Sequence, residues 1–223
     1  MSWPTDWASW SRAGADPRVD RWHPYRYNSR VSGQAEPLVR GAEVLLRRPG
    51  EEDRDEFVAL RHASADFLRP WEPRPARGLD PHGGPAFAAF LEGSHTERRE
   101  RLLLCRERDG AILGGVNINE IVRGPFQSAY LGYWIGADFA RRGYMGEGLS
   151  LALRHAFEGM ELHRVEANIR PENEASIALV RRAGFQREGY SPRYLEINGD
   201  WCDHERWALL ADDWRSQRPQ LRT

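Results

Sequence analysis

The chain has 223 residues, 40% of them hydrophobic, and a formal net charge of −1, which suits one folded domain with extra segments. The near-zero charge excludes a nucleic-acid binder that relies on bulk electrostatic attraction, and we expect no direct nucleic-acid partner. Mean hydropathy is −0.69 and no apolar run approaches the roughly 20 residues of a membrane helix, so we expect no membrane span.

Residues 1–40 differ from the rest and are expected to form a tryptophan-rich arm. The polar start MSWPTDWASW does not resemble a signal peptide. The aromatic residues of the arm follow neither the strand nor the helix period: Trp3, Trp7, Trp10, Trp22, Tyr25 and Tyr27. Because tryptophan is seldom left in water, we expect the arm to pack on the main domain or on a second copy, which would make a homodimer. A disordered tail is the alternative.

The main domain is expected over residues 41–215, followed by a tail at 216–223. Its first half predicts, in order, a strand at 44–48, a helix starting at the acids 51–53, a proline- and glycine-rich loop at 69–85, and a helix around Phe87, Phe90 and Leu91. A hairpin follows, with strands at 101–107 and 111–122 turned at Asp109-Gly110.

The second half continues with further strands and helices. The pattern predicts a strand at 128–135, a helix at 146–160, a strand at 163–170, a helix from Asn173 to Gly184, and a last hairpin of 185–197 and 201–210 turned at Asn198-Gly199. Interspersed strands and helices of this kind predict an α/β (α+β) fold, with a mixed sheet carrying helices on both faces.

A glycine-rich loop between the strand at 128–135 and the next helix predicts an anion site. Backbone N–H groups at a helix start lack partners, and the helix dipole makes that end positive. The loop is not a nucleoside-triphosphate P-loop, because the chain contains no lysine, and Gly143, Gly146 and Gly148 do not match the dinucleotide fingerprint. A ligand-free strand-to-helix turn is the alternative.

Four stretches resemble the GNAT acetyltransferases, and within them the RimJ/RimL group of protein N-terminal acetyltransferases. They cover roughly residues 44–214 and read IVRGPFQSAYLGYWIG, RRGYMGEGL, HRVEANIRPENEASIALVRRAGFQREGY and YLEINGDWCDHERWAL. The resemblance implies the GNAT fold, with a mostly antiparallel central sheet of about seven strands flanked by helices.

The resemblance also implies acetyl-CoA as cosubstrate. Its pantetheine arm would lie beside the central strand, at Tyr133, Trp134 and Ile135. Its pyrophosphate would lie on the backbone of the loop, at Arg141, Arg142, Gly143, Tyr144, Met145 and Gly146. Ala140 and Met145 depart from the family pattern, but both mainly supply backbone. The two arginines would add charge to the phosphates or form a solvated face.

The resemblance further implies a role for Asn173 and Ser176, which match the family's N-x-x-S pattern. Asn173 is also the expected N-cap of its helix. Val180 stands where many relatives have a tyrosine that protonates the leaving thiolate, so Ser176 or solvent would do this. An alkyl thiol has a pKa of about 8.5, so the task is not demanding.

Attack on a thioester requires a neutral amine, and a modest base is enough to supply one. The candidates are Glu120, near the end of the preceding strand, Glu196, which shares a strand face with Tyr194, and Asp203. A plain surface charge is the alternative for each. Glu147 lies at a helix start, where an acid is favoured anyway, and is not assigned to catalysis.

No metal or disulfide is expected. The seven histidines are scattered without a His-Glu-x-x-His pattern, and there is no Cys-x-x-Cys. Cys105 and Cys202 lie in strand-like segments and are expected to be small buried residues in a reducing cytoplasm.

The expected function is acetyl transfer from acetyl-CoA to a primary amine by direct attack in a ternary complex. The resemblance favours the N-terminal α-amine of a protein, of the ribosomal-protein type. Two alternatives stay open: a small amine such as a polyamine or an antibiotic, which needs an acidic pocket, and a non-catalytic module that binds acyl-CoA.

Overall fold

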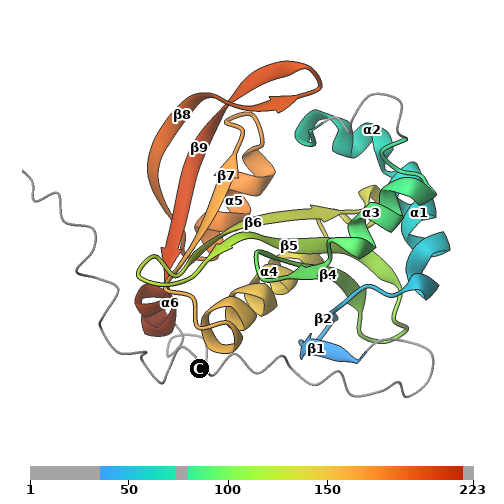
Figure 1. Ribbon diagram of the computed structural model, residues 1–223, viewed down its shortest axis with the longest axis horizontal. Helices are drawn as coiled ribbons and strands as arrows, with labels where there is room; N and C mark the ends of the chain where they lie inside the picture. The colour runs from blue at the N-terminus through green and yellow to red at the C-terminus, as the bar shows by residue number, and fades with distance from the viewer. Residues whose placement is uncertain (1–35, 74–79, 218–223) are drawn as a thin grey trace, which may run out of the picture. The chain divides into compact units, whose positions relative to one another are not determined.

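The computed structural model describes residues 36–73 and 80–217 (Figure 1). These residues belong to the second of two compact units into which the chain divides, residues 31–223. The predicted aromatic contacts of the arm and the predicted homodimer fall outside the described residues. Within this part of the chain, no helix is long and apolar enough to cross a bilayer.

One sheet of nine strands organises the described residues. The strands are β1 (Pro37–Arg40), β2 (Val44–Arg47), β3 (His95–Thr96), β4 (Arg99–Arg106), β5 (Ile112–Val122), β6 (Ser128–Ile135), β7 (Arg164–Ile169), β8 (Gln186–Ile197) and β9 (Asp200–Leu210). Their order is β1-β2-β4-β5-β6-β7-β9-β8, with β3 paired to β4. Only the β6–β7 pair is parallel among them, so the predicted mixed, mostly antiparallel sheet is confirmed.

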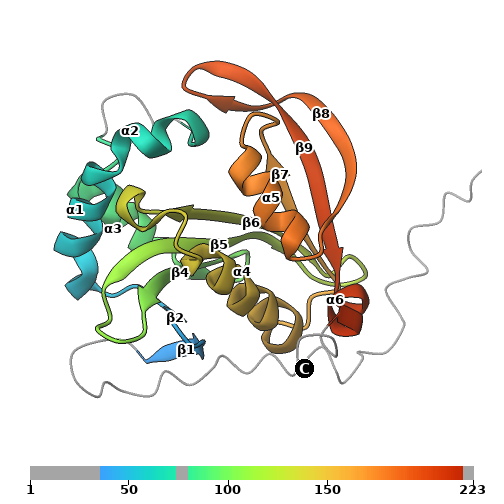
Figure 2. The same ribbon diagram turned by 180° about the vertical axis from the view of Figure 1, so that it is seen from behind.

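Helices cover both faces of this sheet (Figures 1 and 2). They are η2 (Glu51–Asp53), α1 (Arg54–Ala63), α2 (Ala65–Leu68), η3 (Arg69–Trp71), α3 (Gly84–Glu92), η4 (Ala137–Phe139), α4 (Tyr144–Arg154), the π-helical turn η5 (His155–Gly159), α5 (Glu174–Arg182) and α6 (Ala211–Gln217).

Strand β4 shows how the sequence builds two cores. Side chains alternate across a strand, so the apolar run Leu102 to Cys105 feeds both faces. Leu102 and Leu104 join the cluster beneath α4 and α5, together with Leu149. Leu103 and Cys105 join the cluster beneath α1 and α3. The sheet is therefore buried on both faces, which holds its central strands firmly under the site.

The predicted hairpins and most predicted helices are confirmed, while the strand count differs. The sheet has nine strands rather than about seven. Strand β3 has two residues and is too short to show a period, and β1 lies within the stretch assigned to the arm. The sheet thus begins at Pro37, and the last described helix, α6, ends at Gln217. The predicted loop at 69–85 contains η3 and the start of α3.

Glu100, on β4, is a buried carboxylate whose charge should stabilise the fold. Only 4% of the residue is exposed. Its oxygens accept from Arg48 Nη2 at 2.8 Å and lie 2.8 Å from His155 Nε2. Burial by itself would raise the pKa of this carboxyl, but the contacts with His155 and Arg48 overcome it and hold the pKa at about 2.

We expect the stability that depends on Glu100 to disappear in acid. The folded-state pKa lies below the ordinary 4.5, so this stability is present above pH 4.5 and is lost as pH falls toward 2. The difference corresponds to about 3 kcal/mol. Urea unfolding between pH 7 and pH 2 should show this loss in the wild type and not in Glu100→Gln. The exposed Glu196→Gln should keep the wild-type pH dependence, and an equally pH-dependent Glu100→Gln would contradict the assignment.

Candidate active site

The parallel strands β6 and β7 separate partway along their length. They pair through Ser128, Ala129 and Tyr130, opposite Arg164 to Glu166, and not beyond. From Leu131 onward β6 still pairs with β5, while its other edge carries no strand in the described part of the chain. An open strand edge of this kind is where an extended molecule can add by backbone hydrogen bonds.

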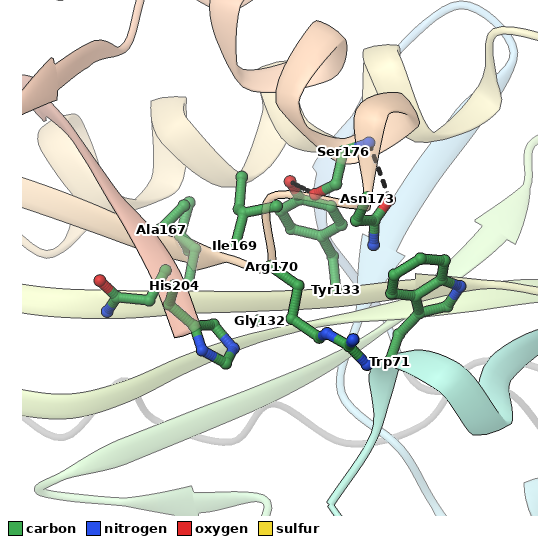
Figure 3. A pocket seen from close by; sticks show the side chains of 11 residues that line it. Trp71, Gly132, Tyr133, Ala167, Ile169, Arg170, Asn173, Ser176 and His204 are labelled. Atoms are coloured by element: carbon green, nitrogen blue, oxygen red, sulfur yellow. Dashed lines mark hydrogen bonds between the residues drawn. The ribbon is translucent and has the colours of Figure 1, made fainter. Parts of the chain in front are cut away.

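A cavity of about 150 Å³ lies at this separation (Figure 3). It is lined from both strands, from the start of α5, from η3 and from β9. The lining residues are Trp71, Leu131, Gly132, Tyr133, Ala167, Asn168, Ile169, Arg170, Asn173, Ser176 and His204. The predicted residues Tyr133, Asn173 and Ser176 thus meet in one place, while Trp134 belongs to the core beneath α1 and α3.

Two hydroxyl groups meet on one side of the cavity. Tyr133 Oη, from β6, lies 2.6 Å from Ser176 Oγ, from the first turn of α5 (Figure 3). Asn173 caps this helix, because its Oδ1 accepts from Ser176 N at 3.1 Å. Burial raises the pKa of Tyr133 to about 12, although the hydrogen bond with Ser176 acts in the opposite direction. Tyr133 therefore keeps its proton at neutral pH, and the pair can pass a proton to a neighbouring atom.

Trp71 and Arg170 form a second part of the cavity wall. Arg170 Nη1 donates to the carbonyl of Pro70 at 2.8 Å, and its guanidinium carbon lies 5.7 Å from the centre of the Trp71 ring. Figure 3 shows the two side chains side by side. The segment is also held from α1, since Arg61 donates twice to Glu72, at 2.6 and 2.7 Å. These contacts place an aromatic face and a positive charge at the cavity.

The β8–β9 hairpin reaches over to the same segment. At its turn, Asn198 Nδ2 donates to the carbonyl of Arg69 at 2.6 Å. Figure 1 shows the tip of the hairpin approaching the end of α2. Residues more than a hundred positions apart in the sequence therefore bridge the outer side of the cavity.

His204, on β9, brings an imidazole to the cavity. The residue is 4% exposed, and its Nδ1 lies 3.0 Å from the carbonyl of Cys202. Burial lowers the pKa of His204, and the charge of Arg170 acts in the same direction. The hydrogen bond with the Cys202 carbonyl and the charges of Glu172 and Asp203 oppose it. The ring is therefore neutral at physiological pH. Within residues 36–73 and 80–217, no carboxylate lines the cavity.

The loop before α4 exposes a run of unpaired backbone N–H groups. The amides of Arg141 to Met145 have no hydrogen-bond partner among the described residues. Arg141 and Gly143 have φ values of 61° and 86°, and this left-handed geometry turns successive N–H groups toward one side. The amide of Gly146 differs, because it donates to the carbonyl of Gly143 at 2.9 Å. The loop has the form that an anionic phosphate requires.

Some charged side chains around this loop have no ion-pair partner in the described part of the chain, whereas Glu147 is hydrogen-bonded. Arg141 and Arg142 are exposed, and no ion-pair partner for them exists in the described segments, so their charge is available to a ligand. Glu147 accepts from the backbone amides of Ala42 and Glu43, at the β1–β2 turn. Glu147 therefore ties the helix start to the edge of the sheet, in agreement with its exclusion from catalysis.

Gly143→Ala is expected to weaken CoA binding about tenfold. A Cβ there meets nothing within 4 Å, so the effect is backbone strain of about 1–2 kcal/mol at φ 86°, which the loop can relieve by turning its N–H groups away. Gly124→Ala is the matched control, since Gly124 also has a positive φ of 70° and open space. Calorimetric titration with CoA and urea unfolding should give equal stability losses but weaker binding only in Gly143→Ala. Equal affinity in both variants would contradict the loop's role.

The predicted carboxylate bases lie away from the cavity lining. Glu120 has a positive φ of 48° at a β-bulge, and its side chain is 46% exposed and paired with Arg98. Glu196 is exposed near the β8–β9 turn. Asp203 accepts from the Tyr190 hydroxyl and the backbone amide of Arg193. Their catalytic roles stay predictions that the geometry does not favour.

Tyr194 lies beside the cavity rather than in its lining. Its hydroxyl accepts from Asn168 Nδ2 at 3.1 Å, and its ring centre lies 5.2 Å from that of His204. Burial raises the pKa of Tyr194, so the hydroxyl is protonated at neutral pH. Tyr194 can hold His204 and Asn168 in place, whereas its catalytic role stays a prediction.

Sequence reasoning missed the outer wall of the cavity, formed by Trp71, Arg170 and His204. His204 is adjacent to the candidate Asp203, and alternation puts the two on opposite faces of β9. The pairing of β8 with β9 shifts between Ser191 and Leu195, so the face that meets the cavity cannot be counted from the hairpin turn.

Known proteins resemble this chain in sequence and in fold. Residues 43–186 match the acetyltransferase (GNAT) domain. The ribosomal protein uS5-alanine N-acetyltransferase of Escherichia coli K12 is 36% identical over 166 residues, which cover 74% of this chain and 84% of that protein. RimJ of Mycobacterium smegmatis, solved with CoA-disulfide, has a TM-score of 0.72 at 31% identity and covers 80% of this chain and 90% of its own. The ribosomal-protein-S5-alanine acetyltransferase of Vibrio fischeri has a TM-score of 0.69 at 25% identity, covering 78% and 97%.

Proposed function

Because this chain belongs to the GNAT family of acetyltransferases, we propose that it transfers the acetyl group of acetyl-CoA to the N-terminal α-amine of a protein. It is an acetyl-CoA-dependent acyltransferase close to the ribosomal-protein N-acetyltransferases. The class of acceptor and the roles of individual residues are what we propose.

The observation that carries the choice of acceptor is the charge of the cavity. Among the described residues, its lining contains Arg170 and the neutral His204 but no carboxylate. A polyamine carries several positive charges and needs acidic partners, so an arginine in the wall disfavours it. A peptide N-terminus has one amine, and the rest of the peptide can contact Trp71 and the β8–β9 hairpin. The relative in Escherichia coli is described as acting on an alanine of ribosomal protein uS5, which supports the same class.

The cosubstrate would lie along the open edge of β6 with its diphosphate on the loop before α4. The unpaired amides of Arg141 to Met145 would bind the phosphates, and the open edge from Leu131 to Ile135 would take the extended pantetheine arm. The thioester would then lie at the separation of β6 and β7, beside the Tyr133–Ser176 pair. Backbone N–H groups at the open strand edge can hold the thioester oxygen as it becomes anionic.

In the proposed reaction the neutral amine attacks the thioester carbon, a C–N bond forms and the C–S bond breaks. Holding the two reactants together can supply roughly 7–11 kcal/mol of the barrier reduction. Ser176 Oγ would donate a proton to the departing thiolate and be re-supplied through the Tyr133 hydroxyl. Val180 is fully buried in the core, and in the proposed reaction the tyrosine hydroxyl would be that of Tyr133 on β6.

The acceptor class can be tested with a panel of amines. The wild-type protein, acetyl-CoA and peptides with diverse N-termini, including Ala and Ser, should give acetylated α-amines by mass spectrometry. Spermidine and aminoglycosides should react at least about tenfold more slowly at equal concentration, because of Arg170. Acetylation of the polyamines with unreacted peptides would contradict the proposal. Tight CoA binding without turnover of any amine would favour the non-catalytic alternative.

A further inference from the structure

The cavity contains an imidazole that the mechanism above does not use. His204 lines the wall formed by β9, and in Figure 3 its ring and the Arg170 guanidinium lie on the opposite side of the cavity from the Ser176 hydroxyl. The amine adds to one face of the planar thioester carbonyl, and a proton acceptor on the wall away from the Tyr133–Ser176 pair leaves that pair to serve the departing thiolate. His204 lies on that wall.

The local contacts of His204 select the form that a base needs. Its Nδ1 lies 3.0 Å from the carbonyl of Cys202, which can only accept, so Nδ1 carries the proton. Nε2 is then an acceptor, and it has no hydrogen-bond partner among the residues that the structure describes. The ring of Tyr194 packs on the imidazole at 5.2 Å between centres and restrains its orientation.

The charges around His204 keep the ring neutral before the amine arrives. Arg170 follows β7, Glu172 precedes α5, and Asp203 is the neighbour on β9. Burial and Arg170 outweigh the Cys202 carbonyl and the two carboxylates, which act in the opposite direction, so the pKa lies below its ordinary value. A neutral imidazole can take a proton from an ammonium group at physiological pH, while an imidazolium cannot.

Asn168 supplies a second, independent feature of the same wall. Its Oδ1 is buried and has no hydrogen-bond partner within the described residues, although its Nδ2 donates to the Tyr194 hydroxyl. A buried carbonyl oxygen without a donor is unfavourable unless a ligand supplies one. Asn168 lines the cavity and shares a sheet face with His204, as the pairing of Asn168 with Arg206 requires.

We propose that the acceptor ammonium donates to Asn168 Oδ1 and loses one proton to His204 Nε2, which makes His204 the general base of the acetyl transfer. This inference rests on the proposed function. The protons of the reaction balance. His204 takes the first proton from the ammonium group and releases it to solvent, and the neutral amine then attacks the thioester. The second proton leaves the nitrogen as the amide forms, and the thiolate gains one proton, giving N-acetyl product, CoA thiol and one released proton.

The test is the pH dependence of His204→Gln. At pH 7 we expect kcat to fall about 10²-fold, with the KM for acetyl-CoA unchanged. An α-amine has a pKa of about 8, so near pH 9.5 it is already neutral and the deficit should shrink to a few-fold. In His204→Ala, added imidazole should restore part of the activity at pH 7. His163→Gln, an exposed histidine outside the cavity, is the matched control and should behave like the wild type.

Each outcome separates a chemical role from a structural one. A deficit of equal size at every pH, without rescue by imidazole, would overturn the assignment of a base, as would full activity of His204→Gln at pH 7. Calorimetric titration with CoA checks folding, since both variants should bind it with wild-type affinity. If the wild-type protein acetylates no peptide, the proposed function fails and the inference fails with it. If the wild type acetylates peptides and His204→Gln keeps its pH profile, the inference alone fails.

Discussion

Ser176→Ala is expected to lower kcat for peptide acetylation about 10²-fold, with little change in the KM for acetyl-CoA. The change removes the hydroxyl that lies 2.6 Å from Tyr133 Oη and faces the cavity. It keeps the backbone amide that Asn173 caps, so α5 should remain in place. This decrease in kcat is at the low end of the rate effects of general acid catalysis, because a thiol of pKa about 8.5 leaves readily as an anion.

Steady-state kinetics with an N-terminal peptide and direct thiol detection would measure this effect. Tyr133→Phe, which keeps the ring but removes the second hydroxyl, should reduce kcat by a smaller factor, because Ser176 Oγ can still donate its own proton to the thiolate. Ser216→Ala, on the exposed face of α6, is the control and should be neutral. Full activity of Ser176→Ala would mean that solvent protonates the thiolate.

Asp53→Ala is expected to lower the free energy of unfolding by about 3–5 kcal/mol, which is a large part of a domain's stability. Asp53 is 4% exposed and accepts from Arg47 at 2.5 and 2.7 Å, and from the backbone amide of Gly50 at 2.7 Å. Arg47 is 2% exposed, and the contact with Asp53 offsets the effect of burial and raises the pKa of its guanidinium. Removing the carboxylate leaves a buried positive charge without its partner.

Urea unfolding at pH 7 checks this expectation. A double variant, Arg47→Met with Asp53→Leu, should recover most of the loss, because it removes both charges together. Asp212→Ala breaks an exposed pair with Arg215, whose side chains are 87% and 56% exposed, and should change stability by no more than about 1 kcal/mol. A loss under 1 kcal/mol in Asp53→Ala would contradict the account of a buried pair.

Much of the fold can be predicted from local sequence patterns. The apolar runs at 101–107 and 128–135, the Asp109-Gly110 and Asn198-Gly199 turns and the Asn173 cap each act over a few residues, and each is confirmed. The sequence patterns did not predict β1, β3 or α6. Strand β1 lies in the stretch assigned to the arm, β3 has only two residues, and α6 has only two buried positions, Ala211 and Trp214.

Local signals also explain why the loop of free amides before α4 could be predicted and the outer wall of the cavity could not. A strand, a glycine loop and a helix start are consecutive in the chain. The free amides of Arg141 to Met145 can therefore be predicted from the order of these elements alone. The carboxylates near the strand ends were reasonable bases by the same logic. In the structure Glu120 pairs with Arg98 and Asp203 binds Tyr190, so neither contributes to the cavity lining.

The sequence by itself determined the family, the order of the main elements, the position of the glycine loop before α4 and the capped serine, because each depends on residues that are neighbours in the chain. Only the tertiary structure decided which side chains share the cavity. Trp71, Tyr133, Arg170, Ser176 and His204 are brought together by the separation of β6 from β7 and by the shifted pairing of β8 with β9. Those two features arise from the packing of the whole sheet, and a one-residue change in strand register reverses which face a side chain meets.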